Sequence, residues 1–490
     1  MNRKTLWLFP LMSLLAGCPS TSSPSGPPLE RFYFPTSLVH VDVPGKTEGV
    51  LFVANANSDK RYATGSVVAV PLDLVGLPPL GTPVAVTDAG VPFVQQLTDL
   101  KLDASQNVQI ASFAGELALQ TVAPNAYRLY APTRSEGMRA YQLLASVNAE
   151  GVPSLSCAGA ETSQNCTGTG ISLTPVSFDG IDAGVQWPFT PFGVTTAPRA
   201  CSAASDCCAA GTACVRSCTA GQCVGLDNLP FADVWVTYSP RTDASTLVAG
   251  RALNGYVARL DSDDFTFKPE NLVPIGLGGA SSVAAFGPWV YVTGRLGLVA
   301  APNLVRLVNR DQLVLSTSLE SLFRVSDSRG VALSSDGKRL FVVGRVPDTL
   351  MVAAIDNPLG IPTLNFVRGV NLPDAPNAVQ VIARPGRGDL VAITCTSAGS
   401  LALYDEDVGD LVATVSGLGA QPFGLAVDVR ANAARIYVSN FGDGRIAVID
   451  VPDLERPQGA RLVARLGEQQ VCLTRGSSSP NCLASKEVAQ

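Results

Sequence analysis

The chain is a succession of short runs in which apolar and polar residues alternate, and most runs end at turn-forming residues. The clearest group lies near the C-terminus, where residues 425–427, 435–440 and 445–450 have the pattern of three strands separated by a turn and a Gly-rich loop. Alternation with a period of two residues is typical of strands in a small packed sheet. The pattern therefore predicts an all-β protein.

Similar second strands recur along the chain, each centred on a large apolar residue. The last four steps between these residues are 56, 50, 50 and 46 positions, which is the length of one propeller blade. The first two steps, 78 and 105 positions, are too long for one blade and must contain insertions. We therefore predict a seven-bladed β-propeller over residues 29–470, with second strands around Phe52, Tyr130, Trp235, Tyr291, Phe341, Val391 and Tyr437.

The last blade resembles a known repeat. Residues 436–440 (Ile-Tyr-Val-Ser-Asn), followed by Gly442, Gly444 and the pair Ile449-Asp450, resemble the YVTN-type, lactonase-like or WD40-like, β-propeller repeat of bacterial surface and periplasmic proteins. The resemblance covers blades five to seven well, blades one and four loosely, and blades two and three poorly. It implies the fold. Lactonase-like propellers depend for activity on polar and basic side chains that have no identifiable counterpart here, so the resemblance does not imply their activity.

The N-terminus has the layout of a secretory signal. Arg3 and Lys4 precede an apolar run at residues 6–15, which is too short to span a membrane. Residues 15–18, Leu-Ala-Gly-Cys, resemble the lipobox of bacterial lipoproteins. This resemblance implies a signal peptide at residues 1–17 and a lipidated Cys18 as the mature N-terminus. The alternative is an ordinary signal with a chance cysteine.

Residues 18–28 consist of the cysteine and a Pro- and Ser-rich segment, which predicts a flexible tether. The residue after Cys18 is Pro19 and not Asp, which in the sorting logic of lipoproteins favours the outer membrane. We therefore expect a cell-envelope protein that a lipid anchor attaches to the membrane. The folded part would lie on either the periplasmic or the surface side of the outer membrane.

Eleven cysteines follow Cys18, and ten of them fall into local groups of even number, which is typical of disulfides formed in an oxidising compartment. The groups are two pairs, Cys157 with Cys166 and Cys472 with Cys482, and a cluster of six: Cys201, Cys207, Cys208, Cys214, Cys218 and Cys223. The cluster predicts a disulfide-rich insertion at residues 200–224, and the second pair predicts a disulfide-closed tail at residues 471–490. Six cysteines allow fifteen pairings, so connectivity stays open, as does a zinc site in their place.

The insertion falls between a first strand at residues 191–194 and a second strand at residues 234–238, so we expect it on the disc face opposite the loops that join second and third strands. There it is either a stabilised loop or a contact surface for another protein. The odd cysteine, Cys395, is expected to be a small buried side chain at a strand end rather than a nucleophile.

The charge of the chain argues against nucleic acid as a partner. The formal net charge is −6, and removal of residues 1–17, which carry two basic residues and no acidic one, changes it to −8. Proteins that bind nucleic acid mostly carry a basic surface that neutralises phosphates.

The loops that join second and third strands are expected to open on one face of the disc, and we call this opening the mouth. The fourth position after the second-strand landmark is arginine in three blades, Arg134, Arg295 and Arg345. Guanidinium groups around one rim could hold a carboxylate, a phosphate or an acidic sugar. The alternative is that each arginine only fastens neighbouring blades. Asn55 and Asn440 end two other second strands and could add polar contacts or simply cap those strands.

The sequence offers little chemistry for catalysis. His40 is the only histidine and lies in an alternating run, so a histidine-based metal cluster is excluded. A structural or exposed histidine is expected rather than a general base. Acidic turns at residues 261–264 and 405–407 could hold calcium but lack the spacing of a calcium loop. We predict no catalytic residue, metal or cofactor.

The resulting prediction is an envelope-anchored, non-catalytic propeller that binds or scaffolds a protein or a glycan. One alternative is a lactonase-like hydrolase or a carbohydrate-active lyase with its site in the central channel near Arg295 and Arg345. Another is a subunit of a larger envelope assembly. Closure of the ring stays open, because residues 31–34 and 460–466 compete as the outer strand of the last blade.

Overall fold

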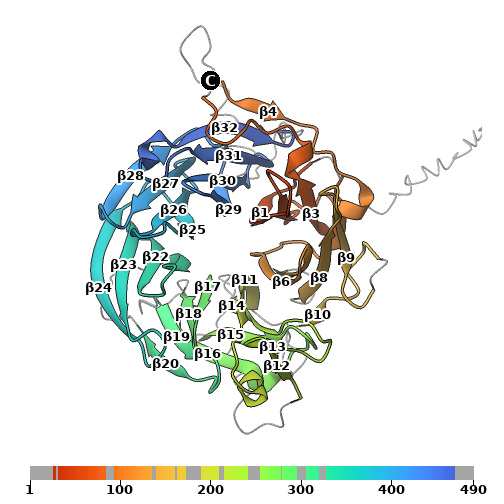
Figure 1. Cartoon of the computed structure of the whole chain (residues 1–490), viewed down its shortest axis with the longest axis vertical. Helices are drawn as coiled ribbons and strands as arrows, with labels where there is room; N and C mark the ends of the chain where they lie inside the picture. The colour runs from red at the N-terminus through yellow and green to blue at the C-terminus, as the bar shows by residue number, and fades with distance from the viewer. Residues whose placement is uncertain are drawn as a thin grey trace, which may run out of the picture.

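The fold is a ring of seven antiparallel sheets around a central axis, as predicted from the repeat (Figure 1). The computed structural model describes residues 26–28, 31–83, 93–134, 139–160, 163–172, 189–208, 215–240, 254–277, 279–294, 305–318 and 327–469. The signal segment, Cys18 and the tail with Cys472 and Cys482 lie outside these described residues. No helix of the described residues is long and apolar enough to cross a membrane.

Each blade runs outward from the axis, with its first strand innermost. Blade 1 consists of β1 (Pro35–Val41), β2 (Val50–Asn55), β3 (Gly65–Pro71) and β5 (Asn107–Ile110), and blade 2 of β6 (Ala118–Ala123), β7 (Ala126–Thr133), β8 (Arg139–Val147) and β9 (Pro153–Cys157), with β10 (Ile171–Ser172) also paired to β8. Blade 3 consists of β11 (Phe189–Pro198), β14 (Ala232–Pro240), β15 (Asn254–Asp261) and β16 (Leu272–Leu277). Blade 4 consists of β17 (Val283–Phe286), β18 (Trp289–Thr293), β19 (Val305–Asn309) and β20 (Leu315–Ser318).

Blades 5 to 7 follow the same plan without large insertions. Blade 5 consists of β21 (Ser328–Leu333), β22 (Arg339–Arg345), β23 (Asp348–Asp356) and β24 (Thr363–Asn371). Blade 6 consists of β25 (Pro376–Ile382), β26 (Leu390–Cys395), β27 (Ser400–Asp405) and β28 (Asp410–Val415). Blade 7 consists of β29 (Pro422–Arg430), β30 (Ala433–Asn440), β31 (Arg445–Val451) and β32 (Arg461–Leu466). Short 3-10 turns lie at Leu72–Leu74, Ala104–Gln106, Ala204–Cys207, Pro269–Asn271 and Pro457–Gly459.

The hydrophobic core is divided into one cluster between each pair of neighbouring blades. The alternation along a strand explains this division, since successive side chains point to opposite faces of the blade. In β22, for example, Leu340 and Val342 pack toward blade 4, whereas Phe341 packs toward blade 6. All seven landmark residues lie in second strands and are nearly or fully buried in these clusters.

The ring closes between blades 7 and 1 by side-chain packing and ion pairs. Strand β32 is the outer strand of blade 7, and β4 (Gln95–Leu97) pairs parallel to it from outside. Residues 31–34 form no strand, and Phe32 is buried in the cluster between the two blades. The fully buried Arg435 of β30 donates to Glu48 of blade 1 and to Asp450 of β31, each at 2.7 Å.

The innermost strands approach one another so closely that glycine is required where they meet. A Cβ atom on Gly115, Gly193 or Gly424 would lie 2.3–2.4 Å from a carbonyl oxygen of the next blade, and one on Gly330 would lie 2.8 Å from such an oxygen. We call these close contacts between neighbouring blades the seams. Threonines of the second strands form hydrogen bonds across the same seams. The Oγ1 atoms of Thr237, Thr293 and Thr394 donate to carbonyl oxygens of the next blade at 2.7–2.8 Å.

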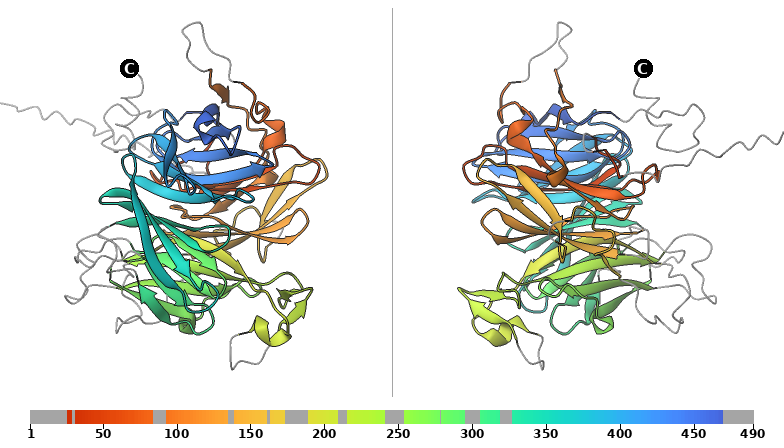
Figure 2. Two further views of the ribbon diagram at one scale, coloured as in Figure 1. Left: turned by 60° about the vertical axis from the view of Figure 1, so that its left-hand side comes forward. Right: turned by 90° about the vertical axis from the view of Figure 1, so that its right-hand side faces the viewer.

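The cysteine-rich insertion leaves blade 3 between β11 and β14 and projects from the rim of the disc (Figure 2). Its hairpin of β12 (Ser217–Thr219) and β13 (Gln222–Val224) is held by the disulfides Cys201–Cys218 and Cys207–Cys223. Cys208 is disulfide-bonded as well, and Cys214 lies outside the described residues. The predicted pair Cys157–Cys166 is confirmed in blade 2.

We expect the glycine seam between blades 7 and 1 to be sensitive to a single methyl group. Gly424→Ala would place Cβ 2.4 Å from the carbonyl oxygen of Thr36, so the free energy of unfolding should fall by about 1–3 kcal/mol. The matched control is Gly369→Ala in β24, where a Cβ meets no atom within 4 Å and stability should change by less than about 0.5 kcal/mol. Urea denaturation of both variants measures the difference in the free energy of unfolding. Equal stabilities of the two variants would contradict the close contact at Gly424.

Candidate functional site

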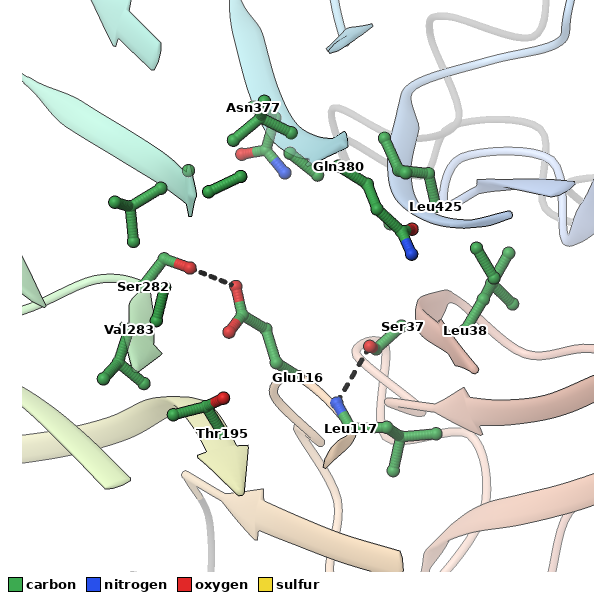
Figure 3. A pocket seen from close by; sticks show the side chains of 18 of the residues that line it. Ser37, Leu38, Glu116, Leu117, Thr195, Ser282, Val283, Asn377, Gln380 and Leu425 are labelled. Atoms are coloured by element: carbon green, nitrogen blue, oxygen red, sulfur yellow. Dashed lines mark hydrogen bonds between the residues drawn. The ribbon is translucent and has the colours of Figure 1, made fainter. Parts of the chain in front are cut away.

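The axis of the ring contains a cavity of about 580 Å³, which we call the central cavity. Its wall is made by the first strands and their N-terminal flanks, and most polar groups on it are neutral hydroxyls and amides. Figure 3 shows several of these side chains around the cavity: Ser37, Thr195, Ser282, Asn377 and Gln380. A cavity of this size is typical of sites for small molecules.

Glu116 is an acidic side chain on the wall of the central cavity and points into it from the segment before β6 (Figure 3). Its Oε1 accepts a hydrogen bond from Ser282 Oγ at 3.1 Å, and its Oε2 accepts one from the backbone N–H of Val194 at 3.3 Å. Among the described residues it makes no ion pair. Burial raises the pKa of the Glu116 carboxyl to about 7, although both hydrogen bonds lower it.

The position of Glu116 is set by its backbone. The N–H of Glu116 donates to Phe192 O at 2.9 Å, and the N–H of the next residue, Leu117, donates to Ser37 Oγ at 2.8 Å. Gly115 allows the first of these contacts, because a Cβ there would lie 2.3 Å from the same Phe192 oxygen. The carboxyl is therefore presented to the cavity by contacts with blades 1 and 3.

Above the central cavity, on the face where second and third strands join, lies a second cavity of about 210 Å³. We call it the mouth cavity. Phenylalanine rings narrow the passage between the two: the centroids of Phe192 and Phe423 lie 6.1 Å apart across the channel, from blades 3 and 7, and Phe441 lies 5.7 Å from Phe423. Two of the arginines that the sequence predicts at the mouth, Arg134 and Arg345, line the mouth cavity.

Arg134 carries a positive charge that the described residues do not neutralise. Its guanidinium lies 5.9 Å from the ring centroid of Phe113 and 5.5 Å from that of Phe192. Its Nε is buried and has no hydrogen-bond partner, and the described residues offer it no ion pair. Burial lowers the pKa of this guanidinium, which nevertheless stays charged at neutral pH. Such a group can attract an anion at little cost, because much of its desolvation has already occurred on folding.

The other two arginines that line the mouth cavity, Arg345 and Arg329, are engaged with the protein. Arg345 donates to Pro376 O and to Asn377 Oδ1 of the next blade, both at 2.9 Å, so it fastens blade 5 to blade 6. Arg329 of β21, which the repeat pattern did not single out, lines both cavities and donates to Asp327 at 2.8 Å. Arg295 lies outside the described residues, so its predicted place at the mouth stays a prediction.

The two asparagines of the predicted mouth do not face it. Asn55 is fully buried, accepts from the N–H of Tyr33 at 3.1 Å and donates to Ser66 Oγ at 3.2 Å. Asn440 is also fully buried and donates to Leu418 O at 3.0 Å. Asn55 therefore joins the segment before β1 to strand β3, and Asn440 holds the segment before β29.

The remaining candidate groups have partners within the fold. His40 is almost fully buried and its Nε2 lies 2.8 Å from Glu48 O. Asp263 pairs with Arg216 of the insertion at 2.9 Å, and Asp405 pairs with Arg384 at 2.7 Å, so both acidic turns bind arginine. Cys395 is buried and free of any disulfide, and burial raises the pKa of its thiol to about 12.

The sulfur atoms of Cys201, Cys207 and Cys223 lie within 4.8 Å of one another, a spacing that a metal ion could bridge. Each of them is in a disulfide, however, and a disulfide sulfur is not the thiolate that zinc requires. The prediction of a disulfide-stabilised insertion is confirmed.

Comparison with known proteins finds no matching family model and no matching curated protein. Solved structures with a similar fold include hydrazine synthase of Kuenenia stuttgartiensis, at 13% identity over 84% of this chain and 97% of that one, with a TM-score of 0.46. The periplasmic gluconolactonase of Pseudomonas aeruginosa has 14% identity, 89% and 97% coverage, and a TM-score of 0.45. At such identities and TM-scores these similarities carry no argument about activity.

We expect stability to depend on pH through Glu116. Its pKa is 4.5 in the unfolded chain and about 7 in the folded one, so the native state binds more protons between these values and stability falls as the pH rises from 4.5 to 7. Glu116→Gln should remove this fall and stabilise the protein above pH 7 by about 1–3 kcal/mol. Urea denaturation from pH 4 to 8 measures it, with the exposed Glu455→Gln as control. Identical pH profiles for the wild-type chain and Glu116→Gln would contradict the raised pKa.

Proposed function

We propose that this chain is a non-catalytic binding module of the cell envelope, which recognises an acidic group of a glycan or a protein at the mouth cavity. We further propose that the lipid on Cys18 anchors it to the membrane. The observation that carries the proposal is Arg134, whose guanidinium lies in the mouth cavity between two aromatic rings without an anionic partner among the described residues.

The surroundings of Arg134 support the recognition of one acidic group together with the ring or side chain that carries it. A cavity of about 210 Å³ is small, and the phenylalanines at its floor offer apolar and π surface. Asn377, Ser239 and Ser281 also line this cavity as polar neighbours. An acid group on Arg134 with its carrier against the rings would combine a charged hydrogen bond with apolar contact.

The proposal is tested by binding of uronic-acid oligosaccharides to the full-length chain in detergent, with neutral oligosaccharides of equal length as the comparison. Arg134→Met removes the charge and keeps much of the apolar stem, so affinity for the acidic ligand should fall by about 10- to 100-fold, as for a lost charged hydrogen bond. Arg456→Met, at an exposed arginine in the loop after β31, is the matched control and should bind as the wild type does.

An equal affinity of the wild-type chain for acidic and neutral oligosaccharides would contradict recognition of an acidic group. So would unchanged binding by Arg134→Met. An acidic peptide of the same charge, tested in the same way, separates a glycan partner from a protein partner.

A second candidate function is hydrolysis in the central cavity, and the one observation that favours it is Glu116. A carboxyl with a pKa of about 7 can both accept and donate a proton near neutral pH. Hydrolysis of a sugar lactone by the full-length chain, lost by at least 100-fold in Glu116→Gln, would support this candidate. A rate equal to that of buffer alone would exclude it for lactones.

A further inference from the structure

We propose that the central cavity is a second binding site, separate from the mouth cavity, for a small polyhydroxylated amine whose ammonium group binds the carboxylate of Glu116. The site is distinct in chemistry as well as in place. Among the described residues, the positive charge at the mouth cavity has no acidic partner, and the acidic group of the central cavity has no basic one.

The first argument is the charge of Glu116 within its surroundings. Each carboxylate oxygen accepts one hydrogen bond, from Ser282 Oγ and from the N–H of Val194, and no basic side chain of the described residues pairs with it. A partly buried carboxylate with neutral donors alone is costly to ionise, and this desolvation raises its pKa. An ammonium ion placed against it would supply the missing countercharge.

The second argument is the set of neutral polar groups around that carboxyl. The side chains of Thr195 and Gln380 line the cavity and make no hydrogen bond to the described residues, and Ser37 Oγ accepts from Leu117 without donating to any of them. Hydroxyl and amide groups of this kind are suited to the hydroxyls of a polyol, because each can donate or accept. Figure 3 shows Gln380 and Ser37 on the side of the cavity opposite Ser282.

The third argument is the sign of the other charges at and near the cavity. Arg329 lines its upper part but is paired with Asp327. At the other end His40 lines the cavity, and the ion pairs next to it lie outside the cavity wall. In this group four carboxylates outnumber two guanidinium groups: Asp42, Glu48, Asp428 and Asp450 against Arg430 and Arg435. This excess favours a cation in the channel over an anion.

A purely structural role for Glu116 is the competing interpretation. Its two hydrogen bonds join blade 2 to blades 3 and 4, so the side chain could serve only to fasten the ring. Glutamine keeps a carbonyl oxygen that can accept one of these bonds, so a fastener would survive Glu116→Gln largely intact, whereas an ammonium site would not.

The probes are 1-amino-1-deoxysorbitol and sorbitol, which differ only in an ammonium or a hydroxyl group at one carbon. Isothermal titration of the full-length chain at pH 8, where Glu116 is ionised and the alkylamine is protonated, should show at least tenfold tighter binding of the amine. Glu116→Gln should lower affinity for the amine to that for sorbitol, with Glu455→Gln unchanged. Ser282→Ala keeps the carboxylate and should retain the preference for the amine.

The wild-type chain provides a test that needs no variant. Between pH 8 and pH 5.5 Glu116 takes up a proton, so affinity for the amine should fall at least tenfold while affinity for sorbitol stays constant. Equal binding of the two probes, absence of amine binding at millimolar concentration, or full affinity in Glu116→Gln would overturn the proposal. None of these outcomes bears on Arg134, so the proposed function at the mouth stands or falls separately.

Discussion

The innermost strands approach one another closely around the axis, and this close packing sets the positions of the side chains that line the channel. Glycines at the seams admit the carbonyl oxygen of the next blade to a distance that a Cβ atom would forbid, as at Gly193 and Gly424. Threonines such as Thr237 then bridge the same seams. Because the first strands are held in this way, one neighbour of each glycine faces the channel, and these neighbours determine the chemistry of the axis: Glu116, Phe192, Arg329 and Phe423.

Two of these neighbours divide the channel. Phe192 and Phe423 each precede a seam glycine, and their rings meet across the axis. The division leaves Arg134 on one side and Glu116 on the other, each without a countercharge among the described residues. Neighbouring cavities with opposite unneutralised charges are poorly explained by stability alone, because each charge costs free energy on burial. The binding of charged ligands that we propose would account for both.

The sequence predicted the blades because a large apolar residue recurs in every second strand, and it predicted the mouth positions of Arg134 and Arg345 from their distance to that landmark. It could not show that Asn55 and Asn440 are fully buried and bonded within the fold. The sequence did not indicate Glu116, because this residue precedes the first strand of blade 2, which matches the repeat poorly. The Pro-Phe-Gly triplet, present at residues 191–193 and 422–424, was the signal that could have revealed the aromatic constriction.

We propose the mouth cavity as an anion site centred on Arg134. The most direct measurement is anomalous diffraction from crystals of the full-length chain soaked in bromide. An anomalous peak beside the Arg134 guanidinium, within the cavity above Phe192 and Phe423, is the expected result. A mouth cavity without bromide, or a guanidinium turned away to pair with a carboxylate, would contradict it.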